Sequence, residues 1–177
     1  MLVLKEKIDC TGCGACAAKC PRNAIVMKSD EEGFLYPDIQ ESVCIRCNLC
    51  MKVCPQNGNN YVNNHVIGFW GGKIKDESIL MKSSSGGAFS AICNVLDDDA
   101  IICGATYDEK MKVHHSWCVN GDGIDIFRKS KYLQSNVGNI YRDVKRFLSE
   151  GKTVLFSGTA CQVSGLYAYL GDRPDKL

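Results

Sequence analysis

Apolar residues in the first third of this chain occur in short runs separated by polar turns. Residues 24–27 and 34–39 each predict a short strand, and residues 30–33 (DEEG) between them predict a turn. Residues 2–9 alternate loosely between apolar and polar side chains, which predicts an edge strand. The asparagine-rich stretch 56–64 then predicts a domain boundary.

The rest of the chain alternates between apolar runs of strand length and segments with helical periodicity. The predicted strands are residues 65–70, 100–105, 113–119 and 153–156. The predicted helices are residues 76–81, 88–96, 136–148 and 160–170. Such alternation favours layers of helix and sheet. We therefore predict an α+β fold, with a small domain at residues 1–57 followed by an α/β layered domain at residues 65–177.

Composition adds one strong asymmetry to this pattern. Eight of the 12 cysteines lie in residues 1–57, and four lie in the remaining 120 residues (177 − 57 = 120). The first segment is too short to rely on a hydrophobic core, so we expect metal–thiolate bonds to stabilise it.

The net charge is +1. No basic tract indicates binding to nucleic acid, and no apolar run approaches the ~18–20 residues of a membrane span.

The eight N-terminal cysteines form a repeated run of fixed spacing. The run Cys-x2-Cys-x2-Cys-x3-Cys-Pro begins at Cys10 and begins again 34 residues later at Cys44 (44 − 10 = 34). This is the bacterial ferredoxin spacing, in which the fourth cysteine of each run ligates the cluster of the other run. We predict two [4Fe–4S] clusters, so that the domain is ferredoxin-like. The ligands of the first are Cys10, Cys13, Cys16 and Cys54, and those of the second are Cys20, Cys44, Cys47 and Cys50.

Zinc and disulfides are alternative uses of these cysteines. Structural zinc sites use pairs of cysteines separated by a longer gap, and a tetrahedral ion needs neither three successive short steps nor a following proline. Residues 1–7 lack the long apolar segment of a secretory signal, and an oxidising compartment would damage the clusters. We therefore expect a cytoplasmic protein, with a zinc-stabilised structural module as the less favoured alternative.

Two loops of the second segment have the composition of anion sites. Residues 83–87 (SSSGG) precede a predicted helix, and residues 157–159 (SGT) leave a predicted strand and enter another helix. Free backbone N–H groups at a helix N-terminus bind phosphate well. However, serine and threonine are also ordinary N-caps and glycine is an ordinary turn residue. Each loop taken singly is therefore better explained as a cap.

Three motifs taken together resemble the family of coenzyme F-420 hydrogenase/dehydrogenase beta subunits. They are SSSGGAFS at residues 83–90, KSKYLQS at 129–135 and FSGTACQ at 156–162. The resemblance covers residues 65–170, and a ferredoxin module in front is common in bacterial members. It implies a flavin-containing iron–sulfur oxidoreductase that passes electrons between clusters, FAD and a soluble acceptor. Family members continue well beyond residue 177, so the resemblance also implies that the C-terminal half is missing.

The resemblance also implies a set of flavin contacts: Ser84, Ser85, Gly86, Gly87, Lys131, Gly158 and Thr159. Lys131 would place a positive charge near the flavin N1–C2 carbonyl and stabilise a reduced, anionic ring. Without the resemblance it is better explained as a solvated surface lysine. Ala160 stands where the family has a proline at a helix start, a position where alanine is tolerated.

Four further cysteines and the histidines have less specific signals. Cys93 and Cys103 are expected to be buried small hydrophobes. Cys161 starts a predicted helix, where a thiolate is favoured, and Cys118 has no predicted role. The spacing of the histidines does not indicate a metal site: His65, His114 and His115.

The leading prediction is an electron-transfer oxidoreductase in which a two-cluster ferredoxin domain serves an α/β domain related to flavin-binding subunits. Its cofactors would be two [4Fe–4S] clusters and FAD, and its partner a redox protein or a soluble electron carrier. The alternative is a non-catalytic electron carrier or docking fragment. No catalytic residue is predicted, and whether the chain is an enzyme stays open.

Overall fold

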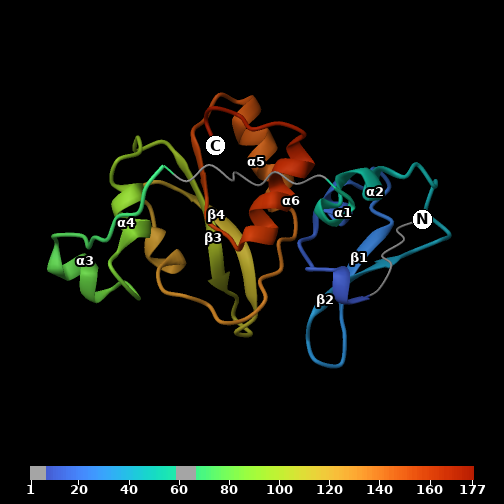
Figure 1. The fold of residues 1–177 in the computed structure, drawn as a ribbon, viewed down its shortest axis with the longest axis horizontal. Coiled ribbons are helices and arrows are strands. Elements are labelled where there is room, and N and C mark those ends of the chain that lie inside the picture. Colours follow the sequence, from blue (N-terminus) through green and yellow to red (C-terminus); the bar gives the residue numbers. More distant parts are fainter. Residues whose placement is uncertain (1–6, 59–66) are drawn as a thin grey trace. The chain divides into compact units, whose positions relative to one another are not determined.

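The computed structural model of the protein describes residues 7–58 and 67–177 (Figure 1). Two compact units make up the chain. The first unit consists of Met1–Val62, Asn136–Lys145 and Gly158–Arg173. The second unit consists of Asn63–Ser135, Arg146–Ser157 and Pro174–Leu177. The first unit includes two segments of the predicted second domain, residues 136–145 and 158–173. The division into domains at 1–57 and 65–177 stays a prediction.

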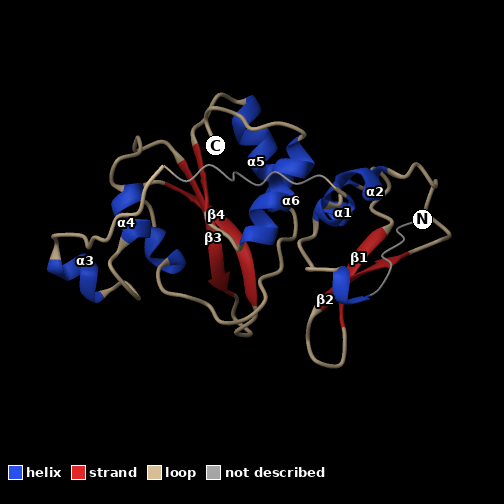
Figure 2. Ribbon diagram, in the orientation of Figure 1, coloured by secondary structure: helices blue, strands red, loops and turns tan. Residues whose placement is uncertain are grey.

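The first unit contains two short helices, a hairpin, one later helix and the beginning of another (Figure 2). Its elements in chain order are a 3-10 helix at Lys7–Asp9, α1 at Ala15–Lys19, β1 at Ile25–Ser29, β2 at Leu35–Ile39, α2 at Leu49–Val53 and a 3-10 helix at Pro55–Asn57. Helix α6, Ala160–Leu170, and the first turns of α5, Ile140–Ser149, complete it. The edge strand predicted at 2–9 is wrong for residues 7–9, and residues 2–6 lie outside the described residues.

The 34-residue repeat of the sequence is also a repeat of the backbone. Helices α1 and α2 are 34 residues apart, and each follows a residue in the left-handed region, Gly14 at φ 75° and Asn48 at φ 60°. Each helix ends at an extended cysteine, Cys20 or Cys54. The proline after each cysteine explains this stop, because it disfavours helical conformation in the residue before it.

Strands β1 and β2 form an antiparallel hairpin, which confirms the strands predicted there. Ile25 pairs with Ile39 and Met27 with Pro37. Asp30 closes the turn, since its carboxylate accepts hydrogen bonds from the backbone N–H groups of Glu32 and Phe34. The side chains of each pair therefore lie next to each other on the hairpin.

The second unit is built on a three-stranded sheet of order β4–β3–β5. Strand β3, Ile101–Tyr107, is antiparallel to β4, Val113–Val119, and parallel to β5, Val154–Phe156. Its other elements are α3 at Glu77–Met81, α4 at Ala88–Cys93 and a 3-10 helix at Ile124–Phe127. A buried cluster of Cys93, Ile102 and Phe127 joins α4 to the sheet. Helices and strands in both units confirm the predicted α+β class.

Two local predictions fail for identifiable reasons. The strand predicted at 65–70 is absent from residues 67–70, where the side chains of Ile67, Phe69 and Trp70 are exposed rather than packed in a core. Residues 65–66 lie outside the described residues. The helix predicted from residue 136 begins at Ile140, because Gly138 adopts φ 54° and its N–H bonds to the Asn136 side chain instead.

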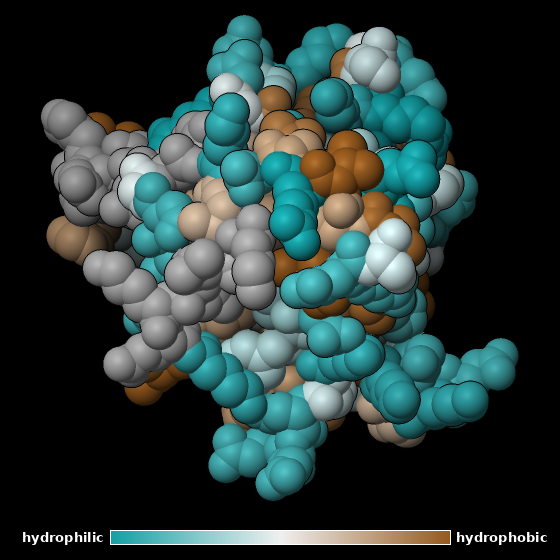
Figure 3. Space-filling view, turned by 90° about the vertical axis from the view of Figure 1, so that its right-hand side faces the viewer, coloured by the Kyte–Doolittle hydropathy of each residue, from teal (hydrophilic) through white to brown (hydrophobic). Residues whose placement is uncertain are grey.

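The surface is mainly polar on the face shown in Figure 3, where hydrophobic side chains form small patches among hydrophilic ones. Within residues 7–58 and 67–177, every helix is too short or too polar to cross a bilayer.

Candidate functional site

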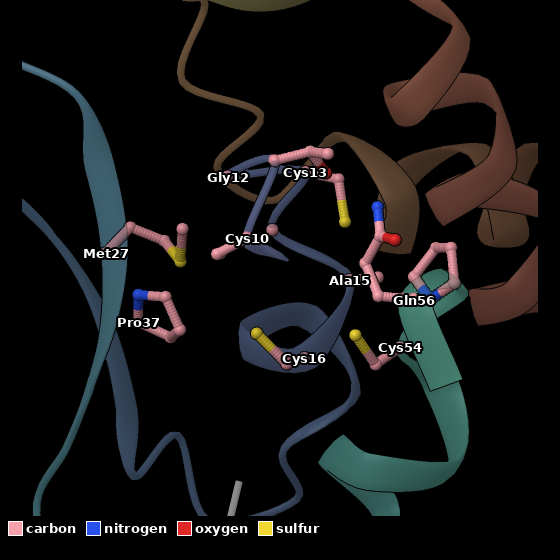
Figure 4. A pocket seen from close by; sticks show the side chains of 12 residues that line it. Cys10, Gly12, Cys13, Ala15, Cys16, Met27, Pro37, Cys54 and Gln56 are labelled. Carbon is pink, nitrogen blue, oxygen red and sulfur yellow. The ribbon is translucent and has the colours of Figure 1, made fainter. Parts of the chain in front are cut away.

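Four cysteines from both sequence runs line one cavity of the first unit. In this cavity Cys54 of the second run joins three cysteines of the first run: Cys10, Cys13 and Cys16. The sulfur atoms of Cys13, Cys16 and Cys54 point into this space, and Met27 and Pro37 of the hairpin face it from the opposite side (Figure 4). A paired position of the hairpin thus forms the apolar wall of the cavity.

A second cavity repeats this arrangement with the roles of the two runs exchanged. Here Cys20 of the first run joins three cysteines of the second run: Cys44, Cys47 and Cys50. Ile25 and Ile39, the other matched pair of the hairpin, line it. In the part of the chain that the structure describes, no three side chains of ligand type converge closely enough to hold a single metal ion. Eight thiol ligands around two apolar spaces suit iron–sulfur clusters by donor chemistry.

Backbone conformation aims amide groups at the sulfur atoms. Gly12 and Gly14 take φ values of 66° and 75°, and the equivalent residues of the second run, Arg46 and Asn48, take 54° and 60°. The loop so formed brings the N–H of Gly12 to Cys10 and that of Ala15 to Cys13. Such N–H···S hydrogen bonds stabilise anionic sulfur and help set the potential of an iron–sulfur centre.

Burial differs between the two cavities. Burial raises the pKa of the Cys13 thiol to about 11 and that of Cys16 to about 12, so iron has to displace their protons on binding. In the second cavity, by contrast, Cys47 is exposed and the other three cysteines are only partly buried. The symmetric sequence repeat therefore forms one inner and one outer cysteine site.

Helix α6 and the start of α5 cover the inner site. The buried Tyr141 hydroxyl donates toward the carbonyl oxygens of Cys13, 2.9 Å away, and Gln162, 2.8 Å away. Gly165 of α6 lies so close that a Cβ atom there would be 3.2 Å from Cys13 Sγ and 3.0 Å from the Tyr141 hydroxyl oxygen. A side chain at position 165 would therefore fit only if the helix, Tyr141 or Cys13 shifted by a few tenths of an ångström.

Two basic side chains cap helix ends next to this contact. Arg142 donates from Nε to the carbonyl of Ala18, at 3.0 Å, and from Nη2 to Asn23 Oδ1, at 2.7 Å. Lys19 donates to the carbonyl of Tyr169 at 2.8 Å. Burial, with a smaller contribution from the nearby Lys145 ammonium, lowers the pKa of Lys19. Cations at helix C-termini satisfy the last carbonyls, so these bonds fasten α1 to α5 and α6.

The residues predicted to contact flavin fall into both units. In the second unit, the Ser84 and Ser130 hydroxyls are 3.4 Å apart, and Gly87 caps α4 at φ 79°. Gly86 has no space for a side chain, because a Cβ there would lie 2.5 Å from the Gly72 carbonyl oxygen. Ser85 belongs to the same exposed turn.

The remaining predicted contacts are Lys131, Gly158 and Thr159. The Lys131 ammonium donates to the carbonyls of Ile126 and Arg128, at 2.9 and 2.8 Å, and burial lowers its pKa. Gly158 and Thr159 belong to the first unit, where Thr159 caps α6 and its N–H bonds to the Gln162 side chain. Each of these loops thus has a structural role, and a flavin contact there stays a prediction.

His115 is a residue of this region that sequence reasoning missed. Its Nε2 lies 3.1 Å from the Ser157 carbonyl and its Nδ1 lies 2.7 Å from the Ser135 hydroxyl. Because a carbonyl only accepts, Nε2 carries the proton and Nδ1 accepts from Ser135. The ring also stacks on Phe156 at 5.2 Å, and burial lowers its pKa. His115 therefore links two of the sequence motifs, and its inward position on an alternating strand was the available signal.

Of the other four cysteines, two are buried and two are partly buried. Cys93 and Cys103 are buried, which confirms their prediction as small hydrophobes, and Cys118 packs against the same core. Cys161 is partly buried, with its Sγ 3.1 Å from the Thr159 hydroxyl. It also lies near enough to Cys13 to contribute to the raised pKa of that thiol.

Comparison with known proteins agrees with this geometry. Residues 9–57 match the family model of the 4Fe-4S dicluster domain. Over 141 residues the chain is 27% identical to one of the subunits of F(420)H(2) dehydrogenase in Methanosarcina mazei, a match that covers 72% of this chain and 40% of that protein. An uncharacterised ferredoxin of Methanocaldococcus jannaschii is 32% identical over 56 residues, covering 31% of this chain and 70% of the ferredoxin. A ketoisovalerate oxidoreductase subunit of Methanothermobacter marburgensis is 31% identical over 53 residues, covering 29% of this chain and 67% of that protein.

The contact at Gly165 gives a first prediction. Gly165→Ala adds a methyl group against Cys13 and Tyr141, and we expect it to destabilise the inner site by about 1–3 kcal/mol, the usual cost of overpacking. Helix propensity alone would favour alanine by about 1 kcal/mol. Release of iron to a chelator under anaerobic conditions measures the effect, and we expect about half of the iron to leave faster.

Ser164→Ala is the matched control, because it changes the neighbouring residue of the same helix. We expect its iron-release curve to overlay that of the unaltered protein. Equal curves for Gly165→Ala and Ser164→Ala would show that α6 does not pack against the inner site.

The buried His115 gives a pH prediction. A histidine whose pKa is lowered by folding takes up a proton more readily when unfolded, so the protein loses stability as pH falls through about 6.5. We expect His115→Gln to lower the free energy of unfolding by about 1–3 kcal/mol at neutral pH. It should also make that free energy less sensitive to acid. Denaturation followed by tryptophan fluorescence tests it, with His114→Gln as the control on the same strand. An unchanged pH slope in His115→Gln would refute the assignment.

Proposed function

We propose that this chain, which carries a 4Fe-4S dicluster domain and is similar to a subunit of F(420)H(2) dehydrogenase, passes electrons between two [4Fe–4S] clusters and a flavin or deazaflavin-type acceptor. The proposed ligands are Cys10, Cys13, Cys16 and Cys54 for the inner cluster. The outer cluster would be held by Cys20, Cys44, Cys47 and Cys50.

One observation carries this proposal: each cavity is lined by three cysteines of one run and the fourth cysteine of the other run. When bound, each cubane supplies a centre that gains or loses one electron at a time. The chain provides the thiolates, the N–H groups directed at them, and apolar walls at Met27 and Pro37 that exclude water. These are the features by which a protein sets a cluster potential.

A flavin would convert single electrons into a hydride equivalent. Its support is the likeness to the dehydrogenase subunit over 72% of the chain and the three motifs at residues 83–90, 129–135 and 156–162. His115 supports the same proposal, since it ties Ser135 of the second motif to Ser157 of the third. The proposed contacts are Ser84, Ser85, Gly86, Gly87, Lys131, Gly158 and Thr159.

A second function is that of an electron carrier without flavin. It is favoured because two of the proposed flavin contacts already make hydrogen bonds within the protein. The Lys131 ammonium already donates to two backbone carbonyls, and Thr159 is engaged in capping α6. The chain also spans 40% of the length of the dehydrogenase subunit. In this case the clusters alone would exchange electrons with a redox partner.

Anaerobic purification followed by FAD titration separates the two functions. We expect iron and acid-labile sulfide near eight atoms each per chain, as two cubanes require. Saturable FAD binding, with flavin reduction when the clusters are reduced, would support the first function. The same iron content with no FAD binding would support the carrier, and zinc without a visible chromophore would contradict both.

Two quadruple serine variants test the exchange of ligands between runs. Replacing Cys10, Cys13, Cys16 and Cys54 should remove one cluster and leave about four iron atoms per chain. Replacing the whole first run, Cys10, Cys13, Cys16 and Cys20, removes ligands from both clusters and should leave fewer than four. The number of changed residues is the same in both. Four iron atoms in the second variant and fewer in the first would overturn the assignment.

A further inference from the structure

We propose that a cation-rimmed cavity next to Cys20, lined by Lys19, Arg142 and Lys145, is the docking site of an acidic electron-carrier protein. The proposal rests on the electron-transfer function proposed above and adds the place where electrons enter and the chemistry of the partner. It concerns the first unit alone, since all four residues belong to it.

The position of Cys20 is the main evidence. Cys20 lines the outer cysteine cavity together with Cys44, Cys47 and Cys50. It also lines an open cavity on the surface, whose other lining residues include Lys19, Asn23 and Tyr169. The two cavities therefore share this cysteine as a common wall. A protein seated in the open cavity would be one residue away from the proposed outer cluster.

Two of the three cations around this opening are held in place by hydrogen bonds to neutral groups. Lys19 is fixed by the Tyr169 carbonyl at 2.8 Å and lies over the Tyr169 ring at 5.1 Å. Arg142 is fixed by the Ala18 carbonyl and by Asn23. Lys145, the third cation, is exposed. Among the residues that the structure describes, none of the three forms an ion pair with an acidic side chain.

Three surface lysines elsewhere in the chain each have an acidic partner: Lys7 pairs with Asp30 at 2.7 Å, Lys28 with Asp38 at 2.6 Å and Lys152 with Asp99 at 2.6 Å. The open cavity, by contrast, has three cations and no acidic side chain among its described lining residues. Fixed like charges of this kind attract a surface of opposite sign and orient it during encounter.

The partner is identified by two requirements. Its docking surface has to be acidic, to match the rim, and its redox centre has to lie near that surface, to face Cys20. A reduced carrier bound there would lose one electron to the centre that Cys20 ligates, so oxidation of the carrier and reduction of this protein balance at one electron each. A small acidic ferredoxin meets both requirements, whereas a nucleic acid meets only the first.

The test measures binding and electron transfer between the holoprotein and a small, strongly acidic 2[4Fe–4S] ferredoxin as the probe. At low salt, we expect Lys145→Glu to weaken binding and to lower the second-order rate constant of electron transfer by about tenfold, the scale of electrostatic steering. At several hundred millimolar salt the difference should disappear because the charges are screened. Lys145→Arg keeps the charge and should restore both values.

Lys110→Glu is the matched control, because it makes the same charge change at an exposed residue of the second unit. It should leave binding and rate within about twofold of the unaltered protein, since Lys110 does not line the open cavity. Equal losses in Lys110→Glu and Lys145→Glu, or no loss in either, would overturn the docking site. Reduction by dithionite separates this failure from a failure of the proposed function, which would leave even the unaltered protein unable to accept electrons.

Discussion

The close approach of helix α6 to Cys13 is the constraint on which the first unit depends. A Cβ atom at position 165 would lie only 3.2 Å from the Cys13 sulfur, and the buried Tyr141 hydroxyl bonds to the backbone of the same cysteine. Arg142 and Lys19 add hydrogen bonds to the carbonyl ends of α1 and α6. A cysteine loop near the N-terminus is thus packed against segments more than 120 residues later in the chain.

This packing makes the two cysteine sites unequal although their sequences repeat. The inner site lies beneath α6, with Cys13 and Cys16 buried, while the outer site has an exposed Cys47 and shares Cys20 with an open cavity. Solvent exposure and hydrogen bonding set cluster potentials, so the two proposed clusters should differ in potential. Under the proposed function, the outer site would exchange electrons with a protein in solution, because it is the more exposed of the two.

Local features of the chain could be predicted because their causes are local. The repeated cysteine spacing predicts which four sulfurs share each cavity, and the strand at 113–119 and the helix at 160–170 occur at their predicted bounds. The packing of Tyr141 and Gly165 on Cys13 could not be predicted, because it depends on contacts between distant segments. The strand predicted at 65–70 is absent from residues 67–70 for a related reason. Apolar residues form a strand only where neighbouring segments bury them, and these residues are exposed.

Hydrogen exchange measured with and without the clusters is the most direct test of this account. If the inner cluster and α6 stabilise each other, removal of iron under anaerobic conditions should lower amide protection in residues 160–170 and 140–145 as strongly as in residues 10–20. The amides of β3 and β4 in the second unit should keep their protection. Unchanged protection of α6 after loss of both clusters would contradict the account, because α6 would then fold independently of the site it covers.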